Sequence, residues 1–186
     1  KALYDSKSGE RGIFSRQAAK KIVEKNGRRD PNYEFGTNPC SEIILRSREF
    51  CNLSEVVVRP EDNEETLAKK VRLATVLGTF QSTLTNFKYI SKEWKKNCEE
   101  ERLLGVSLTG IVDNPMMTHK NDNLGELLEG LKGVAVQVNE KYAGDIGINQ
   151  SAAITCVKPS GTVSQLVDSA SGIHARHNPY YIRTVR

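Results

Sequence analysis

Helix-like stretches alternate along this chain with short apolar runs, and this alternation is the feature that most restricts its fold. Residues 15–26 and 124–142 carry apolar side chains at helical spacing, whereas residues 105–110 and 152–157 are short apolar runs that lead into turn residues. Strands that are apolar on both faces are typical of parallel pairs covered by helices. The sequence therefore predicts an α/β fold with mainly parallel strand pairing.

A long central helix is expected to form much of the core. Asp62 and Glu65 have the spacing of a capping box, and the helix dipole also favours an acidic residue there. The helix is expected to reach about Leu84. The apolar side chains predicted to form its buried stripe are Leu67, Val71, Ala74, Leu77, Phe80 and Leu84. A shorter helix is expected over residues 92–101, whose interspersed Lys and Glu side chains are typical of a solvated face.

Charge and hydropathy exclude several classes of protein. The 186 residues include 27 Lys and Arg against 23 Asp and Glu, and the two signs are interspersed, so no nucleic-acid partner is expected. No apolar run reaches the length of a membrane span, and the first residues do not resemble a signal peptide. Four cysteines in a chain of this length do not indicate a disulfide-rich secreted protein. We therefore expect a cytoplasmic protein without a membrane partner.

The first group of residues that indicates chemistry is Asn38, Cys40 and Glu42, in a segment stiffened by Pro39. In extended backbone, alternate side chains point to the same side. A carboxamide, a thiol and a carboxylate would then face one site, with a hydrogen-bond partner, a sulfur and a proton acceptor. The alternative is an Asn-Pro turn leading into a strand, with Cys40 merely packed.

A second thiol, Cys51, lies eleven residues after Cys40. Residues 42–45 and 51–59 are β-prone, and a turn near Ser47 between them would bring both thiols to one pocket. The alternative is a buried strand cysteine. A metal site is not indicated, because the two cysteines lack the usual short ligand spacing.

A third segment, residues 158–164, follows an apolar strand and precedes an apparent helix start. Backbone N–H groups at a helix N-terminus, with hydroxyls nearby, suit a phosphate. The glycine and lysine spacing is not that of a P-loop. The alternative is a capped turn that binds nothing.

In this order, the motifs resemble the large catalytic chain of ribonucleotide reductases, in particular the adenosylcobalamin-dependent ribonucleoside-triphosphate reductases. The resemblance covers nearly the whole chain and is carried by residues 38–43, 50–56, 100–110, 157–164 and 180–183. It implies that residues 1–186 are a single piece of the catalytic domain, part of a ten-stranded α/β barrel with a cysteine-bearing finger loop through its centre. Both ends look truncated, so we expect a fragment that is inactive alone.

The resemblance also implies roles for individual residues. Cys40 would become a thiyl radical and take the 3′ hydrogen of the ribose, and Glu42 would be the base at the 3′-hydroxyl. Asn38 would hold a ribose hydroxyl, and Cys51 would be one of two cysteines that reduce the intermediate. The residues that would bind the substrate phosphates are Ser160, Gly161, Thr162, Val163 and Ser164.

The implied cofactor is adenosylcobalamin as radical source, because the protein leaves this step to a cofactor. The implied partners are a ribonucleoside triphosphate substrate, a dithiol reductant such as thioredoxin, and the remainder of the reductase chain. The redox partner of Cys51 would come from an earlier strand, so Cys98 and Cys156 are expected to be packed or incidental. Three alternatives remain: a reductase of this family with a separate metal-containing radical subunit, a nucleotide-binding module without chemistry, and a host segment beside a protein-splicing element.

Overall fold

The structure is a computed structural model that describes residues 1–8, 12–118, 121–182 and 184. Its elements are α1 (Ala2–Ser6), α2 (Arg16–Asn26), β1 (Phe35–Thr37), β2 (Ile44–Arg46), β3 (Asn52–Val57), α3 (Glu64–Gln81), α4 (Lys92–Glu101), β4 (Leu104–Thr109), the short 3-10 helices Ile111–Asp113 and Pro115–Met117, α5 (Leu124–Ile146) and α6 (Val163–Leu166). Across the described ranges, no helix combines the length and the apolar character needed to cross a membrane.

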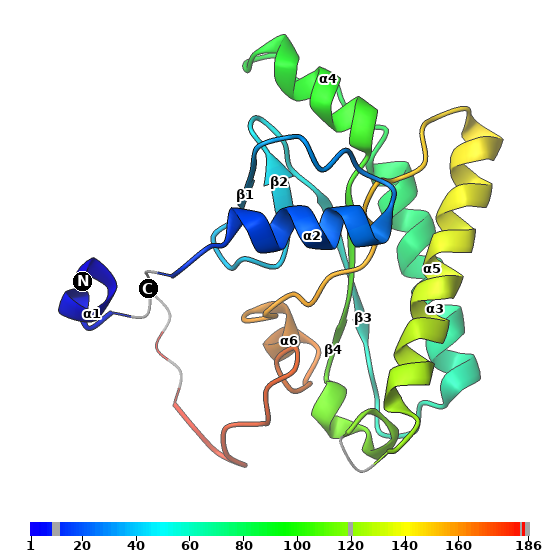
Figure 1. Cartoon of the computed structure of the whole chain (residues 1–186). Helices are drawn as coiled ribbons and strands as arrows, with labels where there is room; N and C mark the ends of the chain where they lie inside the picture. The colour runs from blue at the N-terminus through cyan, green and yellow to red at the C-terminus, as the bar shows by residue number, and fades with distance from the viewer. Residues whose placement is uncertain (9–11, 119–120, 183, 185–186) are drawn as a thin grey trace.

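A parallel sheet lies at the centre (Figure 1). β3 pairs with β4 in parallel, from Asn52 opposite Leu104 to Val57 opposite Thr109. A third segment joins the other edge of β4 through a parallel bridge between Val106 and Thr155. The α/β prediction with parallel pairing is therefore confirmed, whereas the described residues do not form a ten-stranded barrel.

The strand predicted over residues 152–157 is reduced to that single bridge. The backbone N–H of Leu104 donates to Ala153, and that of Val106 donates to Ile154. Two residues of β4 are thus matched by one residue of the neighbouring segment, which interrupts a regular ladder.

β1 and β2 form a separate antiparallel pair, with Phe35 opposite Arg46. α2 packs on this pair through Ala19 and Val23, which bury Phe35 between them. In Figure 1 this small layer lies on the side of the parallel sheet opposite α3 and α5. It positions the segment between β1 and β2 over the open face of the sheet.

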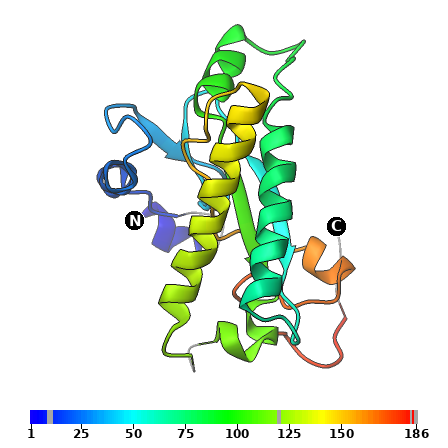
Figure 2. The same ribbon diagram turned by 90° about the vertical axis from the view of Figure 1, so that its right-hand side faces the viewer.

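α3 and α5 lie side by side and cover the other face of the parallel sheet (Figure 2). The core between them contains Leu67, Val71, Ala74, Leu104, Val106, Leu131 and Ala135. The predicted stripe is correct for its first half and wrong for its second, because Leu77, Phe80 and Leu84 are 67%, 48% and 72% exposed. α3 instead turns Thr75 and Thr79 inward, and each hydroxyl bonds to the carbonyl one turn earlier, at 2.8 Å.

The predicted start of α3 is one residue early. Asn63 accepts a hydrogen bond from the N–H of Thr66, and the Thr66 hydroxyl accepts one from the N–H of Asn63. This is the capping box. Asp62 instead accepts from the Thr66 hydroxyl at 2.8 Å and pairs with Lys70. The Lys70 pairing and the hydrogen bond from the Arg59 N–H keep the pKa of Asp62 low although burial opposes this.

α4 is fastened to the β1–β2 layer by a buried ionic cluster (Arg29, Arg46, Glu49 and Glu101). Arg29 donates to Glu101 at 2.6 Å and to Glu49 at 3.3 Å. The prediction that the charges of residues 92–101 all face solvent is therefore wrong for Glu101, which is 4% exposed. Burial, and next the hydrogen bond with Glu101, raise the pKa of Glu49 to about 8.

The Glu49 carboxyl should make the stability of the chain depend on pH. Its folded-state pKa of about 8 lies above the ordinary value of 4.5. The stability that this proton contributes is complete below pH 4.5 and is lost as pH rises through the folded-state pKa, by about 1.4 kcal/mol per pH unit at most. We expect the free energy of unfolding in urea to fall between about pH 5 and pH 8. The decline should be shallower in Glu49→Gln and unchanged in Glu65→Gln, an exposed control. Equal slopes in all three proteins would contradict this assignment.

Candidate active site

The segment between β1 and β2 is a tight turn, which we call the finger turn (residues 38–43). Asn38 closes it: its Oδ1 accepts from the Ile43 N–H at 3.0 Å, and its carbonyl accepts from the Ser41 N–H at 3.0 Å. Ser41 has a φ of 64°, in the left-handed region. The backbone is therefore not extended, and the expectation of alternating side chains on one extended strand is wrong. An Asn-Pro turn leading into a strand is what the structure has.

The side chains of the finger turn point to different surroundings. Cys40 is exposed at the turn, with a free thiol. Glu42 is half-buried, and its Oε2 has no hydrogen-bond partner among the described residues although the atom is buried. The turn therefore presents a thiol to the outside and a carboxylate towards the sheet.

Ile43 packs the finger turn against the sheet at Gly105. A Cβ at Gly105 would lie 2.5 Å from Leu53 Cδ2, 3.1 Å from Cys156 Sγ and 3.3 Å from Ile43 Cδ1. Real Cβ atoms do not approach neighbours as closely as the first of these distances. The missing side chain therefore lets the finger turn and three sheet segments converge at one point.

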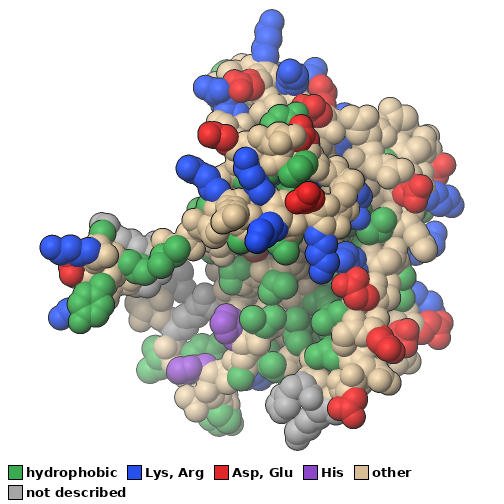
Figure 3. Space-filling view, in the orientation of Figure 1, with side chains coloured by type: hydrophobic (Ala, Val, Ile, Leu, Met, Phe, Trp, Pro, Cys, Tyr) green, Lys and Arg blue, Asp and Glu red, His purple; other side chains and the backbone are tan. Residues whose placement is uncertain are grey.

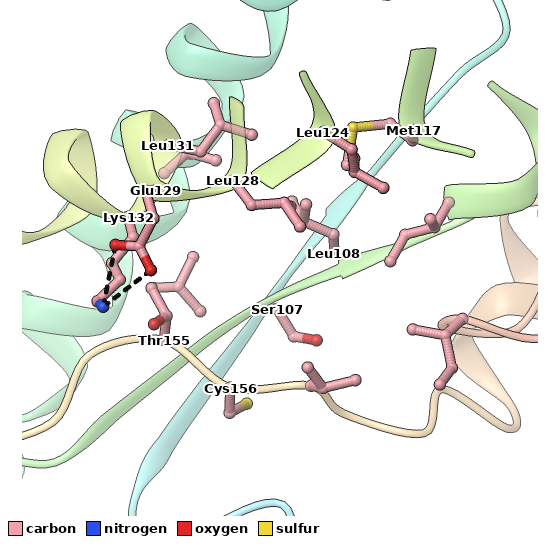
Figure 4. A pocket seen from close by; sticks show the side chains of 15 residues that line it. Ser107, Leu108, Met117, Leu124, Leu128, Glu129, Leu131, Lys132, Thr155 and Cys156 are labelled. Carbon is pink, nitrogen blue, oxygen red and sulfur yellow. Dashed lines mark hydrogen bonds and ion pairs between the residues drawn. The ribbon is translucent and has the colours of Figure 1, made fainter. Parts of the chain in front are cut away.

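Several polar side chains share this surface of the sheet, which we call the site face. Leu53 pairs with Gly105 and Glu55 with Ser107, and strand side chains alternate between the two faces. Figure 4 shows Thr155 pointing to Glu129 and Lys132, with the Cys156 sulfur on the opposite side of that segment. The residues of the site face that we use below are Cys51, Leu53, Glu55, Gly105, Ser107 and Cys156.

Cys51 and Cys156 lie near each other and near Glu42. Burial, and next the negative charge of Glu42, raise the pKa of the Cys51 thiol to about 12. Burial, and next the influence of Cys51 and of Glu42, raise the pKa of Cys156 to about 12. Both therefore stay protonated at neutral pH. They sit on opposite sides of β4, and both are free thiols.

The sequence analysis therefore missed Cys156 as a residue of the site face, whereas its prediction of a packed Cys98 is correct. Cys156 was expected to be packed or incidental, yet its thiol belongs to the site face. Cys98 is buried in α4, as expected. A signal for Cys156 existed, because it stands two residues before Lys158 in a strand-like run, where alternate side chains share a face.

The loop of residues 158–164 buries two of its serine side chains. Ser160 and Ser164 are 0% exposed. The Ser164 N–H donates to Ser160 Oγ at 3.2 Å, and the Ser164 hydroxyl donates to the Ser160 carbonyl at 2.8 Å. Both hydroxyl groups therefore bond within the loop, and the binding of a phosphate by this loop stays a prediction. Gly161, Thr162 and Val163 are the exposed members of the predicted set.

Two hollows lie beside these elements. One, of about 680 Å³, is lined by Gly161, Ser164 and the segment that follows α6. The other, of about 460 Å³, is mostly apolar and lies between α5 and the segment around Thr155, on the helix side of the sheet (Figure 4). In Figure 3 hydrophobic side chains gather where the surface is hollowed, below a region rich in Lys and Arg.

Two further expectations concern the end of the chain and metals. Residues 180–183 resemble a strand of the reductase family, but Tyr180, Tyr181 and Ile182 form no strand here, and Arg183 lies outside the described residues. Among the residues that the structure describes, no group of three or more His, Cys, Asp or Glu side chains is placed to hold a metal ion.

Comparison with known proteins gives a consistent result. No family model matches the chain. The adenosylcobalamin-dependent ribonucleoside-triphosphate reductase of Lacticaseibacillus paracasei is 30% identical over 213 aligned residues, which cover 100% of this chain and 28% of that protein. The reductase of the same name from Lactobacillus acidophilus is 29% identical over 175 residues, which cover 81% of this chain and 23% of that protein.

A solved structure agrees with these relatives. The crystal structure of a B-12 dependent (class II) ribonucleotide reductase matches 75% of this chain and 22% of its own chain, with a TM-score of 0.62 and 28% identity. This chain is a relative of the adenosylcobalamin-dependent ribonucleotide reductases. It spans about a quarter of the length of the curated reductases that it matches.

The four thiols of this reductase relative should differ in reactivity. Cys40 is exposed, Cys98 is buried, and the raised pKa values of Cys51 and Cys156 leave almost no reactive thiolate near pH 7. We expect one thiol to react with Ellman's reagent at least about tenfold faster than the other three in the native chain. Cys40→Ser should abolish the fast phase and Cys98→Ser should preserve it. A fast phase that survives in Cys40→Ser would show that the finger turn is not placed as described.

Proposed function

We propose that the chain is part of the catalytic domain of a reductase that converts ribonucleoside triphosphates to deoxyribonucleotides by radical chemistry. One observation carries this proposal. A finger turn with Cys40 and Glu42 packs on a parallel sheet whose open face carries Cys51, in a chain similar to these reductases along its length. The rest of the reductase would complete the ten-stranded barrel around the site face.

Cys40 would carry the radical. A sulfur radical exchanges a hydrogen atom with a C–H bond, which a closed-shell side chain does not do. The thiol of Cys40 is exposed at the finger turn. A radical source outside the sheet layer could therefore reach it. Adenosylcobalamin, when bound, supplies a carbon-centred radical that starts this chemistry. The thiyl form of Cys40 then takes the 3′ hydrogen of the ribose.

Glu42 would act as the base at the 3′-hydroxyl. Its buried Oε2 lacks a partner in the described part of the chain and is free to accept a proton. Drawing that proton makes it easier for the 2′-hydroxyl to leave as water. Asn38 uses its Oδ1 within the finger turn, so its amide N–H groups would hold a ribose hydroxyl.

Cys51 would supply reducing equivalents to the intermediate. Its raised pKa keeps the thiol protonated, which is the form that can deliver hydrogen. Its oxidation partner would be a cysteine outside this chain, and a dithiol protein such as thioredoxin would restore the pair in the cytoplasm. Gly161, Thr162 and Val163 would line the phosphate site, while Ser160 and Ser164 shape it.

Activity of the full-length protein that contains this chain tests the proposal. We expect deoxyribonucleotide to form from a ribonucleoside triphosphate in the presence of adenosylcobalamin and a dithiol. Cys40→Ser should abolish the product, because the radical has no other carrier on the finger turn. Glu42→Gln should lower kcat by about 100-fold, the size of a general-base contribution.

Cys98→Ser is the matched control, because that thiol is buried in α4 away from the finger turn. It should keep the activity of the unsubstituted protein. Product that requires a metal-containing partner subunit instead of adenosylcobalamin would move the protein to the other class of this family. Full activity in Cys40→Ser would show that the chain does not perform this chemistry.

A further inference from the structure

Lys158 begins the loop at a fixed point on the site face. Its backbone N–H donates to Ser107 Oγ at 2.9 Å, and Ser107 pairs with Glu55 across the β3–β4 ladder. Its ammonium Nζ lies 4.0 Å from Glu55 Oε2. The side chains of Lys158 and Glu55 are 24% and 11% exposed. A backbone bond and an ion pair thus hold this residue over three adjacent segments of the sheet.

The two arginines near the loop, Arg176 and Arg59, already donate hydrogen bonds within the protein. Arg176 donates to Asp113 at 2.9 Å and to Asp168 at 2.7 Å. Arg59 donates to the carbonyls of Val167 and Asp168. Arg176 therefore donates to the protein from all three of its guanidinium nitrogens, and Arg59 donates from both of its terminal nitrogens.

Lys158 differs from both arginines. At 4.0 Å its contact with Glu55 is an ion pair longer than a hydrogen bond, and in the described part of the chain its ammonium donates no hydrogen bond. An ammonium has three N–H donors that seek acceptors. Glu55 in turn has a buried Oε1 without a hydrogen-bond partner among the described residues. The ion pair therefore holds Lys158 in place but does not use its N–H donors in hydrogen bonds. These donors remain for a ligand.

A positive charge beside the loop would strengthen its binding of a phosphate. Its two serine hydroxyls are turned inward, so backbone groups and the Thr162 hydroxyl remain on its exposed side. These groups are neutral, whereas a triphosphate carries several negative charges. A lysine ammonium is a compact cation and a common phosphate ligand in proteins.

We propose that Lys158 binds a substrate phosphate at this loop and that Glu55 is the positioning residue that holds its ammonium on the site face. This inference rests on the proposed function and deepens it. It gives the loop the charged group that its buried serines cannot provide.

The position of Cys156 supports this arrangement. Burial raises the pKa of its thiol, Cys51 and Glu42 raise it further, and Ser107 and Lys158 oppose this, so all four residues lie around Cys156. The site face thus runs from the finger turn, past two thiols, to Lys158 and the loop. A nucleotide whose ribose lies at Glu42 and Cys51 would extend its phosphates towards Lys158.

Steady-state kinetics of the full-length protein separate a positioning role from a structural one. We expect Lys158→Met to raise KM for the ribonucleoside triphosphate about tenfold, the value of one charged hydrogen bond, with kcat within about twofold. Lys158→Arg should restore most of the KM. Inorganic tripolyphosphate should inhibit the unsubstituted protein competitively and inhibit Lys158→Met about tenfold more weakly.

Glu55→Gln should raise KM in the same direction by a smaller factor. It should add nothing in the Lys158→Met background, because Glu55 acts through Lys158. The matched control is the exposed ion pair of Lys69 with Glu65 on α3, at 2.7 Å. Lys69→Met and Glu65→Gln should leave both KM and tripolyphosphate inhibition unchanged.

Three outcomes would overturn the inference: a KM for Lys158→Met equal to that of the control variants, a fall in kcat alone, or fully additive effects of the two substitutions. If Lys158→Met does not fold, as judged by circular dichroism, Lys158→Gln replaces it with the same expectations. If the unsubstituted protein shows no reductase activity, the proposed function fails on its own. Calorimetric binding of tripolyphosphate, weakened or not by Lys158→Met, then still decides the role of Lys158.

Discussion

The parallel ladder between β3 and β4 is the interaction on which the rest of the structure depends. The two faces of this ladder carry different side chains, because the side chains of a strand point alternately to either face. One face, with Val56, Leu104 and Val106, packs into the core beneath α3 and α5. The other carries Cys51 and the ion pair of Glu55. The same hydrogen bonds therefore hold the hydrophobic core together and fix the spacing of the polar groups across the site face.

Local sequence signals predicted the elements well and their partners less well. Helix α4 and the strand β4 begin and end within about one residue of the expected positions, since capping and apolar runs are local properties. The exposed half of the α3 stripe shows the limit. Leu77 and Phe80 have helical spacing like Val71, but whether an apolar position is buried depends on what packs against it. Spacing along one helix does not contain that information.

In the candidate site, too, contacts between segments distant in sequence were harder to predict than local structure. The sequence predicted a shared pocket for Cys40 and Cys51, and that pairing stays a prediction. The residue of the finger turn that acts on the Cys51 thiol is Glu42, next to Ile43, which packs the turn on the sheet. Cys156 was not expected there, since its neighbours come from β4 and beyond, more than forty residues away in sequence. The inward direction of Ser160 and Ser164 depends on hydrogen bonds within the loop, which residue types alone do not reveal.

The space that a side chain would need at Gly105 is already taken by Leu53, Cys156 and Ile43. A side chain there would first meet Leu53 of β3, whose Cδ2 lies 2.5 Å from the position of a Cβ, whereas Ile43 Cδ1 lies 3.3 Å from it. One added methyl group at Gly105 would therefore disturb β3, the segment of Cys156 and the finger turn at the same time.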